Sequence, residues 1–311
     1  MEALLTAPFI SSLLAGALIA GLPLMLAGLG EQMSEKAGVL NIGIEGMMLT
    51  GAYTGFLAAF SFSSLWLGFL GGIAGGMGVA ALMALLCVRM GLNQIVVGIG
   101  LTLGAEGLTA LLHHFQFSTS YPRLPAPGRA DFGPLSDIPV IGPSLLSQHP
   151  VVYLALLLVP VMAYLYRRTN LGLTLAAAGE KPAALDVAGG QVGRMRTAAV
   201  LFTGACAGLG GAYLSTVGAG LFIPYMTNGA GFIGIVLAML ARGRPGWVLA
   251  GALIFGAALS LTTALQVAGS RIPTDIIQML PFAVVMAVLV IWGRRARLPA
   301  ALGLHYERGA R

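Results

Sequence analysis

Residues 167–196 read RRTNLGLTLAAAGEKPAALDVAGGQVGRMR and form the longest polar stretch with an excess of positive charge between the apolar runs of the chain. Its five cations outnumber its two carboxylates, Glu180 and Asp186. Loops of membrane proteins that are rich in Lys and Arg stay in the cytoplasm. The stretch therefore predicts a cytoplasmic loop, around which the apolar segments on either side are arranged.

The middle of this loop carries the signals of a short helix. Pro182 stands at its first turn, and Gly189 and Gly190 follow its end. Such a helix would offer a docking site to a partner, although a plain solvated connector explains the spacing equally well. The residues of the docking hypothesis are Glu180, Lys181, Pro182, Ala183, Ala184, Leu185, Asp186, Gly189 and Gly190.

The composition is that of an integral membrane protein. Hydrophobic residues make up 57% of the chain, charged residues only 9%, and the mean hydropathy is +0.88. Because a membrane-spanning helix needs about 20 residues, the 311 residues allow roughly eight to ten spans. We expect one all-α domain, a polytopic transmembrane helical bundle over residues 1–311, with no room for a soluble catalytic domain.

Several function classes are excluded at this stage. The Arg residues behind the net charge of +6 cluster at span ends and at the tail, where topology explains them, so nucleic acid is not an expected partner. Cys87 and Cys206 lie far apart inside apolar runs and suggest neither a disulfide framework nor a metal site. The sequence contains no GxxxxGK(S/T), GxSxG or HExxH string. We expect no catalytic residue, metal or cofactor in this chain.

Apolar runs predict the membrane-spanning helices. The first run continues past Gly21 and is expected to be a retained span, ending before a polar patch at 31–36. The expected spans are residues 8–29, 39–60, 65–88, 92–112, 151–166, 197–217, 247–267 and 276–292.

The sequence after Gly218 departs from this pattern. Pro224 and Asn228 interrupt the apolar residues, and the run 229–241 is too short to cross a bilayer at about 1.5 Å per residue. This irregularity predicts one broken or re-entrant segment.

The charges favour one orientation. The longest loop, 113–150, is rich in proline and balanced in charge, which suits the outer face. Arg89, the turn at 242–244, the loop at 167–196 and the tail then share the cytoplasmic side. The N-terminus is expected outside and the C-terminus in the cytoplasm. This orientation places Arg294, Arg295 and Arg297 inside and leaves only Arg123, Arg129 and Arg271 outside.

Polar residues within apolar sequence are candidates for a solute path, because ionisable groups are costly in a bilayer. Glu106 could face such a path or bond to a neighbouring helix, with equal support. Glu45 could line the path, or it could reach the membrane surface or cap a broken helix. The amides could bond a polar solute or one another. The candidates are Asn41, Glu45, Asn93, Gln94, Glu106 and Asn228.

Small residues recur four apart, a spacing that lets helices approach closely in lipid. We expect these pairs to serve close packing within the bundle. The pairs are Gly51/Gly55, Gly72/Gly76, Gly100/Gly104 and Gly204/Gly208.

Four regions in this order resemble permease subunits of bacterial ABC importers in the branched-chain amino acid and simple-sugar superfamily. They are GVLNIGIEGMMLTGAY, GLNQIVVGIGLTLGAEGLTALL, AAAGEKPAALDVAGG with the following TGACAGLGGAYL, and GAGFIGIVLAMLARGRPGWVLAGALIFG. The strings NIGIEGMM and GFIGIVLAMLARGRP are most similar to nucleoside-type permeases. The resemblance covers about residues 20–293.

The resemblance implies a translocation subunit of an ATP-driven importer in the bacterial inner membrane. It implies nucleosides as the cargo, with simple sugars or branched-chain amino acids as the alternative. It also implies that residues 179–190 are the coupling helix. The implied partners are cytoplasmic ATP-binding subunits, which bind the ATP, a second permease subunit in a hetero-dimer, an external solute-binding lipoprotein and a small polar solute. A more remote alternative is a proton-coupled secondary transporter with Glu106 as its carrier group.

Overall fold

The computed structural model describes residues 7–128, 130, 138, 140–267, 273–292 and 298–307, and in these residues it contains helices and no strand. The prediction of an all-α bundle is confirmed. The helices, including the π-helical turns η2, η4 and η5, are α1 (Ala7–Lys36), α2 (Ile44–Phe62), α3 (Leu65–Met83), η2 (Ala84–Arg89), α4 (Gln94–Phe117), η4 (Gly142–Leu146), α5 (Pro150–Arg168), α6 (Asn170–Glu180), α7 (Pro182–Val187), α8 (Val192–Tyr213), η5 (Leu214–Gly218), α9 (Ala230–Ala241), α10 (Pro245–Val267) and α11 (Thr274–Trp292).

Most of these helices have the length of a membrane span. Within the described residues, α1, α3 with η2, α4, α5, α8 with η5, and α10 are long and apolar enough to cross. Helices α2 and α11 have 19 residues each, or about 28 Å, close to the roughly 30 Å of a hydrocarbon core. Helix α9 has only 12 residues. The chain is therefore a polytopic bundle with one broken segment, as expected.

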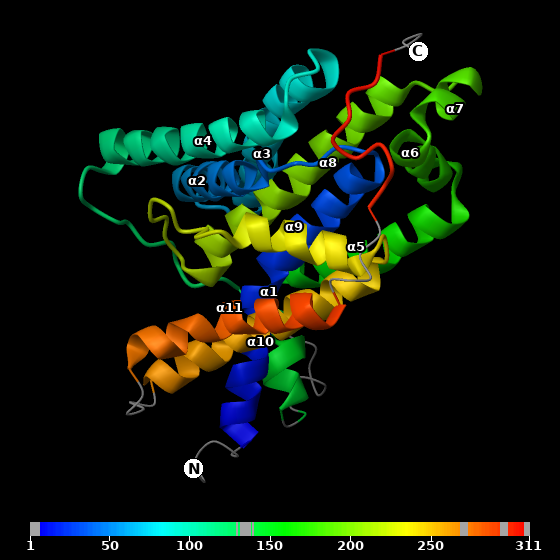
Figure 1. Ribbon diagram of the computed structural model, residues 1–311. Coiled ribbons are helices and arrows are strands. Elements are labelled where there is room, and N and C mark those ends of the chain that lie inside the picture. The colour runs from blue at the N-terminus through cyan, green and yellow to red at the C-terminus, as the bar shows by residue number, and fades with distance from the viewer. Residues whose placement is uncertain are drawn as a thin grey trace.

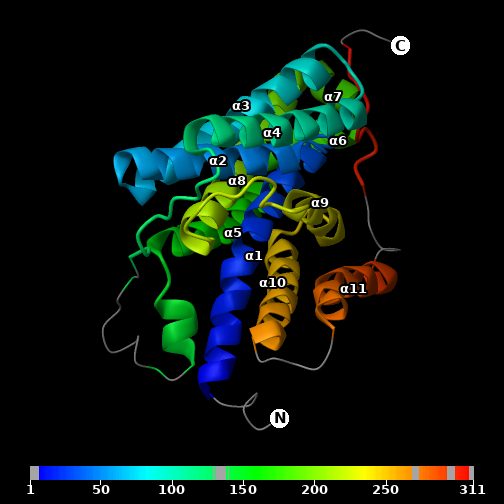
Figure 2. The same cartoon turned by 90° about the vertical axis from the view of Figure 1, so that its left-hand side faces the viewer.

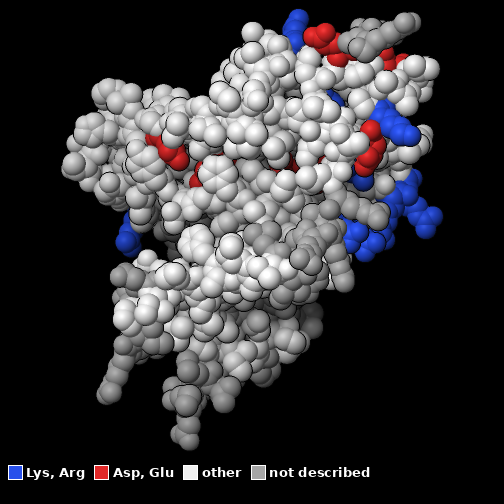
Figure 3. Space-filling model, viewed as in Figure 1, with Lys and Arg blue, Asp and Glu red and all other residues white. Residues whose placement is uncertain are grey.

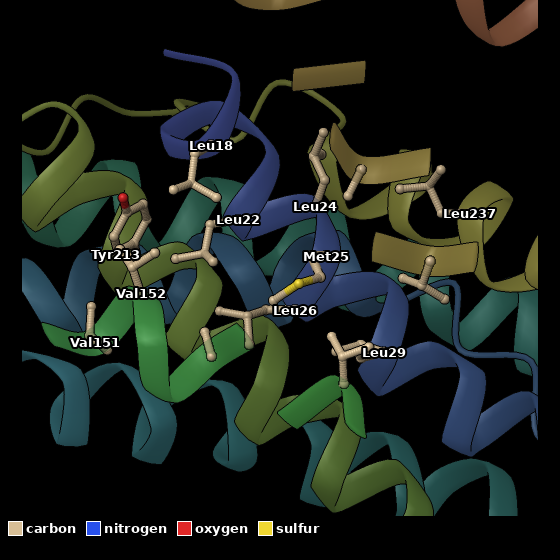
Figure 4. Close-up of a cluster of buried hydrophobic side chains, with 14 of the residues drawn as sticks. Leu18, Leu22, Leu24, Met25, Leu26, Leu29, Val151, Val152, Tyr213 and Leu237 are labelled. Carbon is tan, nitrogen blue, oxygen red and sulfur yellow. The ribbon is translucent and has the colours of Figure 1, made fainter. Parts of the chain in front are cut away.

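Helix α1 runs through the centre of the bundle, with α10 alongside it (Figure 2). It also packs on α8 and α9. Leu22, Met25 and Leu29 of α1 are almost completely buried, and Val152 of α5 and Leu237 of α9 belong to the same cluster (Figure 4). A helix surrounded in this way is apolar around most of its circumference, which explains its apolar run.

The expected end of the first span at residue 29 is wrong. Helix α1 continues for two more turns to Lys36, so the polar patch 31–36 is helical. Its side chains are covered by protein: Glu31 is 0% exposed and Gln32 is 1% exposed. Part of this cover comes from α8, whose Thr203 hydroxyl donates to the Ser34 hydroxyl at 3.0 Å. Segments distant in sequence thus enclose a patch that the local pattern had placed beyond the end of the span.

Glycine pairs bring α2, α3 and α8 together. A Cβ on Gly51 of α2 would collide with the Cα of Gly208 on α8, and a Cβ on Gly76 of α3 would collide with the carbonyl of Gly204. The expected close packing is confirmed for the pairs on these three helices. Gly100 and Gly104 of α4 differ, because a Cβ on either would meet no atom within 4 Å.

The positive charges gather at one end of the bundle, which also carries α6 and α7 (Figures 1 and 3). We call this the basic end. Lys36 and Arg242 line one cavity there with Glu180 of α6, Arg168 ends α5 directly before α6, and Arg89 ends η2 close to the C-terminal segment. The connection that follows α4 lies at the opposite end (Figure 1). The remaining residues of the charge argument, Arg129, Arg271, Arg294, Arg295 and Arg297, lie outside the described residues.

Candidate functional site

The connection between α1 and α2, residues 37–43, gathers several of the predicted polar residues. The backbone amide of Leu40 donates to Oε1 of Gln94 at 2.8 Å, and the amide of Asn41 donates to Oε1 of Glu31 at 3.0 Å. Asn41 is fully buried and Gln94 is 6% exposed. The start of α4 and the end of α1 therefore hold this connection from two sides.

Several polar atoms beside this connection are buried and have no hydrogen-bond partner within the described part of the chain. A buried unsatisfied group costs about 1–3 kcal/mol, so these atoms are suited to bind water or a polar solute. They are Oε2 of Glu31, both amide atoms of Gln32, Oε2 of Glu35 and Oδ1 of Asn41.

A small cavity opens beside this group of atoms at the basic end. Its volume is about 170 Å³, enough for a few water molecules. Gln32 and Glu35 line one wall, while Glu180 at the end of α6 and Arg242 at the end of α9 line others. The cavity thus joins the polar end of α1 to the predicted coupling region.

Glu45 has a different environment and caps the broken segment. Its Oε1 accepts a hydrogen bond from the amide of Gly229 at 2.8 Å, and its Oε2 accepts one from the amide of Gly231 at 2.6 Å. These amides lie at the N-terminus of α9, where a carboxylate is favoured by the helix dipole and by unpaired N–H groups. The geometry supports the capping alternative for this residue.

Gly231 allows this approach because it has no side chain. A Cβ at Gly231 would lie 2.7 Å from the Cα of Glu45. Gly229 has a φ of 82°, in the left-handed region that glycine adopts most easily. The two glycines therefore let the broken chain turn and present its amides to the carboxylate.

The side chains of the other three candidates form none of the described hydrogen bonds to these groups. The side chain of Asn93 caps α4 by accepting hydrogen bonds from the amides of Ile95 and Val96. Asn228 is exposed and has a φ of 43° in the turn before α9. Glu106 is partly exposed on α4, and none of the described hydrogen bonds or ion pairs involves its carboxylate.

The predicted short helix in the basic loop is present as α7. Pro182 is its first residue, and Gly189, with a φ of 85°, follows its end. Leu185 is buried beside Ala178 of α6 and the start of α8. The outer face is exposed, and Val187 has 91% of its surface accessible. Ala183, Ala184 and Lys181 are exposed as well, so α7 presents a small apolar face bordered by a cation.

Two polar residues of the predicted coupling region, Glu180 and Asp186, contact the C-terminal residues. Oε2 of Glu180 accepts a hydrogen bond from the amide of Ala300 at 3.4 Å, and Oδ2 of Asp186 accepts one from the hydroxyl of Tyr306 at 3.2 Å. Gly190 packs closely on the Leu185 side chain. The loop at 167–196 is thus a packed structure, and the C-terminal residues cover part of it.

Sequence reasoning missed the polar end of α1 and one arginine. No proline follows Leu29 before Lys36, so continuation of the helix could have been inferred. Arg196 was counted only as a loop charge. It is 3% exposed in α8 and donates to backbone carbonyls of three segments. Its burial depends on residues more than one hundred positions away, which no local pattern reveals.

Comparisons with known proteins agree on the family. A family model described as "Branched-chain amino acid transport system / permease component" matches residues 13–289. The chain is 30% identical over 314 residues to the guanosine ABC transporter permease protein NupQ of Bacillus subtilis, covering 97% of this chain and 98% of NupQ. It is 30% identical to the nucleoside ABC transporter permease protein NupC of Lactococcus lactis, covering 94% and 96%.

A third relative is named for a different solute. The chain is 39% identical over 285 residues to the "Putative glucose ABC transporter permease protein TsgC13" of Haloferax volcanii, covering 91% of this chain and 85% of TsgC13. Among solved structures, "An inward-facing conformation of a putative metal-chelate type ABC transporter" has a TM-score of 0.53 at 20% identity, covering 90% of this chain and 84% of that chain. The similarity to this solved structure concerns the fold alone.

An ABC permease is the translocation component of its transporter, and membership in this family implies an ATP-binding subunit and a solute-binding partner. The bundle of apolar helices and the family model lead to the same assignment. The chain belongs to the branched-chain amino acid transport system permease family and is a membrane-embedded ABC transporter permease subunit.

Proposed function

We propose that this chain is the translocation subunit of an ATP-driven importer and that α7 couples it to the ATP-binding subunit. The observation that supports this most directly is the exposed apolar face of α7 beyond the membrane-length helices, with Val187 91% exposed. Apolar surface outside the lipid favours a protein partner. Residues 167–196 are then the coupling loop of a single permease domain over residues 1–311.

The orientation follows from the same region. The basic end, with α6 and α7, faces the cytoplasm in a bacterial inner membrane, because loops rich in Lys and Arg are retained there. The N-terminus and the loop at 113–150 then face outside. An external solute-binding lipoprotein would deliver the solute to that outer side.

The proposed cargo is a nucleoside. Two relatives named for guanosine or nucleosides match this chain almost end to end at 30% identity. Glucose is the second candidate, because the relative named for glucose is 39% identical. Both solutes carry a hydroxylated sugar ring, which needs hydrogen-bonding groups along its route. Weak polar sites suit an importer, since it must release what it has received.

A second permease subunit would complete the transporter as a hetero-dimer, and we assign α4 to that contact. One face of α4 is open: Gly100, Gly104 and Gly107 have no neighbouring atom that a Cβ would meet. Small residues let a neighbouring membrane helix approach closely. Glu106 lies next to them, and a carboxylate at that depth needs water or a partner. The solute path would run past Glu106 at the edge of this face, whereas the buried Asn41 and the capping residue Glu45 lie inside the chain.

Transport by the reconstituted complex tests the cargo. The permease is placed in proteoliposomes with its ATP-binding subunit and binding protein, and uptake of labelled guanosine, adenosine, glucose and leucine is measured with ATP on the ATP-binding side. We expect guanosine and adenosine uptake that needs ATP and survives a protonophore. Vesicles without ATP are the control. Uptake of glucose alone would favour the second cargo, and uptake of leucine alone would contradict both.

A further inference from the structure

The C-terminal residues 298–307 lie against the end of α6 at the basic end (Figure 1). The amide of Ala301 donates to the carbonyl of Gly179 at 2.8 Å. The amide of Ala300 donates to Oε2 of Glu180 at 3.4 Å. The C-terminal segment is thus bonded to the last turn of the helix that precedes α7.

The same segment also reaches α7. The hydroxyl of Tyr306 donates to Oδ2 of Asp186 at 3.2 Å. The Tyr306 side chain also packs with Leu185 of α7 and Val192 of α8. Leu185 is the buried residue of α7, so Tyr306 contacts the face of α7 that is turned toward the bundle.

A third contact joins the segment to the connection between α1 and α2. The amide of Gly303 donates to the carbonyl of Gly38 at 3.1 Å. Gly38 has a φ of 89°, and a Cβ there would lie 3.1 Å from the Cα of Gly179 and 3.2 Å from the carbonyl of Ala301. Three backbone segments meet at Gly38, where no side chain would fit.

Arg196 of α8 bonds to all three segments. Its guanidinium donates to the carbonyl of Ala37 at 3.2 Å, to that of Ala178 at 3.3 Å, and to those of Leu304 at 2.6 Å and Ala301 at 3.5 Å. None of the carboxylates in the described residues forms an ion pair with it. The planar guanidinium has five N–H donors in a fixed arrangement, so one side chain can hold several carbonyls together.

The chain that follows α7 is a poor transmitter of movement. Gly189 and Gly190 follow the helix, and Gly189 has no neighbouring atom that a Cβ would meet. A glycine in an open position, such as Gly189, absorbs backbone rotation easily. A displacement of α7 reaches the membrane helices more directly through side contacts than through this turn.

We propose that residues 298–307 and Arg196 form a coupling clamp, which joins α6 and α7 to the connection between α1 and α2. This inference rests on the proposed function of α7. When the ATP-binding subunit displaces α7, the clamp carries the displacement to the polar end of α1. Arg196 is a positioning residue in this scheme, because it acts on backbone segments and touches neither solute nor nucleotide.

Truncation after Leu298 tests the clamp in the reconstituted complex with both permeases, the ATP-binding subunit and the binding protein. We expect basal ATP hydrolysis to remain. Stimulation of hydrolysis by the solute-loaded binding protein should fall about tenfold, within the usual range of coupling energies. The number of solute molecules transported per ATP hydrolysed should fall as well. A purely structural role would reduce the amount of complex while leaving that ratio unchanged, and this result would overturn the proposal.

Two substitutions keep the test decisive if the truncated chain does not assemble. Arg196→Lys retains the charge, but a single ammonium group cannot bond four separated carbonyls, so partial uncoupling is expected. Tyr306→Phe removes the hydroxyl that bonds to Asp186 and retains the ring. Arg194→Lys is the matched control, because Arg194 is exposed on the same helix two residues away. Equal solute-to-ATP ratios for Arg196→Lys, Tyr306→Phe and Arg194→Lys would contradict the clamp.

A parallel variant separates this inference from the proposed function. Ala184→Arg alters the exposed face of α7 without touching the clamp. If Ala184→Arg uncouples the complex while the truncation and Arg196→Lys do not, α7 is the coupler and the clamp is wrong. If none of these variants uncouples it, the role of α7 itself is wrong.

Discussion

The carboxylate of Glu45 accepts a hydrogen bond from the backbone amide of Gly231 at 2.6 Å, although 186 residues separate them. This contact joins the start of α2 to the start of α9 and gives the broken segment its charged cap. A helix that begins inside a bundle must find partners for its first N–H groups, and here one side chain provides two acceptors.

Glu45→Ala should destabilise the permease by roughly 1–3 kcal/mol, because two buried amides lose their acceptors. Glu45→Gln should have a smaller effect, since one oxygen remains while the charge near the helix dipole is lost. Melting temperatures of the purified permease in detergent measure both. Glu106→Gln is the control, and equal melting of Glu45→Ala and Glu106→Gln would contradict the capping role.

Gly208→Val should prevent stable packing of α8, because a Cβ at Gly208 would collide with the carbonyl of Gly72 and lie 3.0 Å from the Cα of Gly76. Overpacking typically lowers the free energy of unfolding by about 1–3 kcal/mol. Because rigid backbone lies on both sides of Gly208, we expect a value at the upper end of this range. Gly104→Val is matched in chemistry but faces open space. We expect low yield for Gly208→Val and normal yield for Gly104→Val when the permease is expressed alone.

Co-expression with the second permease should reverse the result for Gly104→Val. If α4 forms the contact between permeases, this variant weakens assembly while leaving the isolated chain stable. Co-purification of the two permeases measures the effect. Unchanged co-purification would remove this face of α4 from the interface.

Reporters fused after Arg168 and after Arg244 should indicate cytoplasm, and a reporter inserted after Arg123 should indicate the outside. The reason is the gathering of Lys and Arg at the basic end. Paired alkaline phosphatase and fluorescent-protein fusions give opposite signals on the two sides. A cytoplasmic signal after Arg123 would invert the orientation.

Ala184→Arg should leave the permease inserted and folded, because Ala184 is exposed and Leu185 supplies the buried contact of α7. A bulky cation on the docking face should reduce the hydrolysis stimulated by the loaded binding protein about tenfold. ATP hydrolysis in proteoliposomes measures this loss. Full stimulation in this variant would show that α7 is not the coupling helix.

Acid should destabilise the start of α5 through His149. Its Nδ1 accepts a hydrogen bond from the amide of Val151 at 3.2 Å, which requires the neutral ring, and burial lowers the pKa of His149 below its ordinary value. The unfolded chain takes up this proton near the ordinary pKa of about 6.5. The unfolded state therefore binds more protons as pH falls below that value, and stability decreases.

His149→Asn isolates this contribution, because asparagine is a good helix cap that does not titrate in this range. We expect the melting temperature of the native chain to fall more steeply than that of His149→Asn between pH 7.5 and pH 5. Parallel pH profiles for the two proteins would contradict the assignment.

The fold class could be predicted from the sequence because lipid imposes long apolar runs, and the break before α9 was visible as a run too short to cross. The close packing of the glycine pairs on α2, α3 and α8 could also be predicted from their spacing in the sequence. The pair on α4 has the same spacing but faces open space, so spacing alone does not identify the neighbour.

The candidate site was less predictable because its polar residues are paired over long sequence separations. Glu45 bonds to Gly229 and Gly231. Arg196 bonds to carbonyls of residues that come both earlier and later in the sequence. A local pattern can mark a buried charge as unusual, but it does not contain the partner. The polar end of α1 was left outside the first span for the same reason.

The contact between Gly303 and Gly38 can form only at the end of biosynthesis. Residues near position 38 leave the ribosome early, whereas residues 298–307 are made last. The polar end of α1 therefore enters the membrane long before Arg196 and the C-terminal segment exist to enclose it. A chain that stops before Pro299 leaves the cavity beside Glu35 without one of its walls.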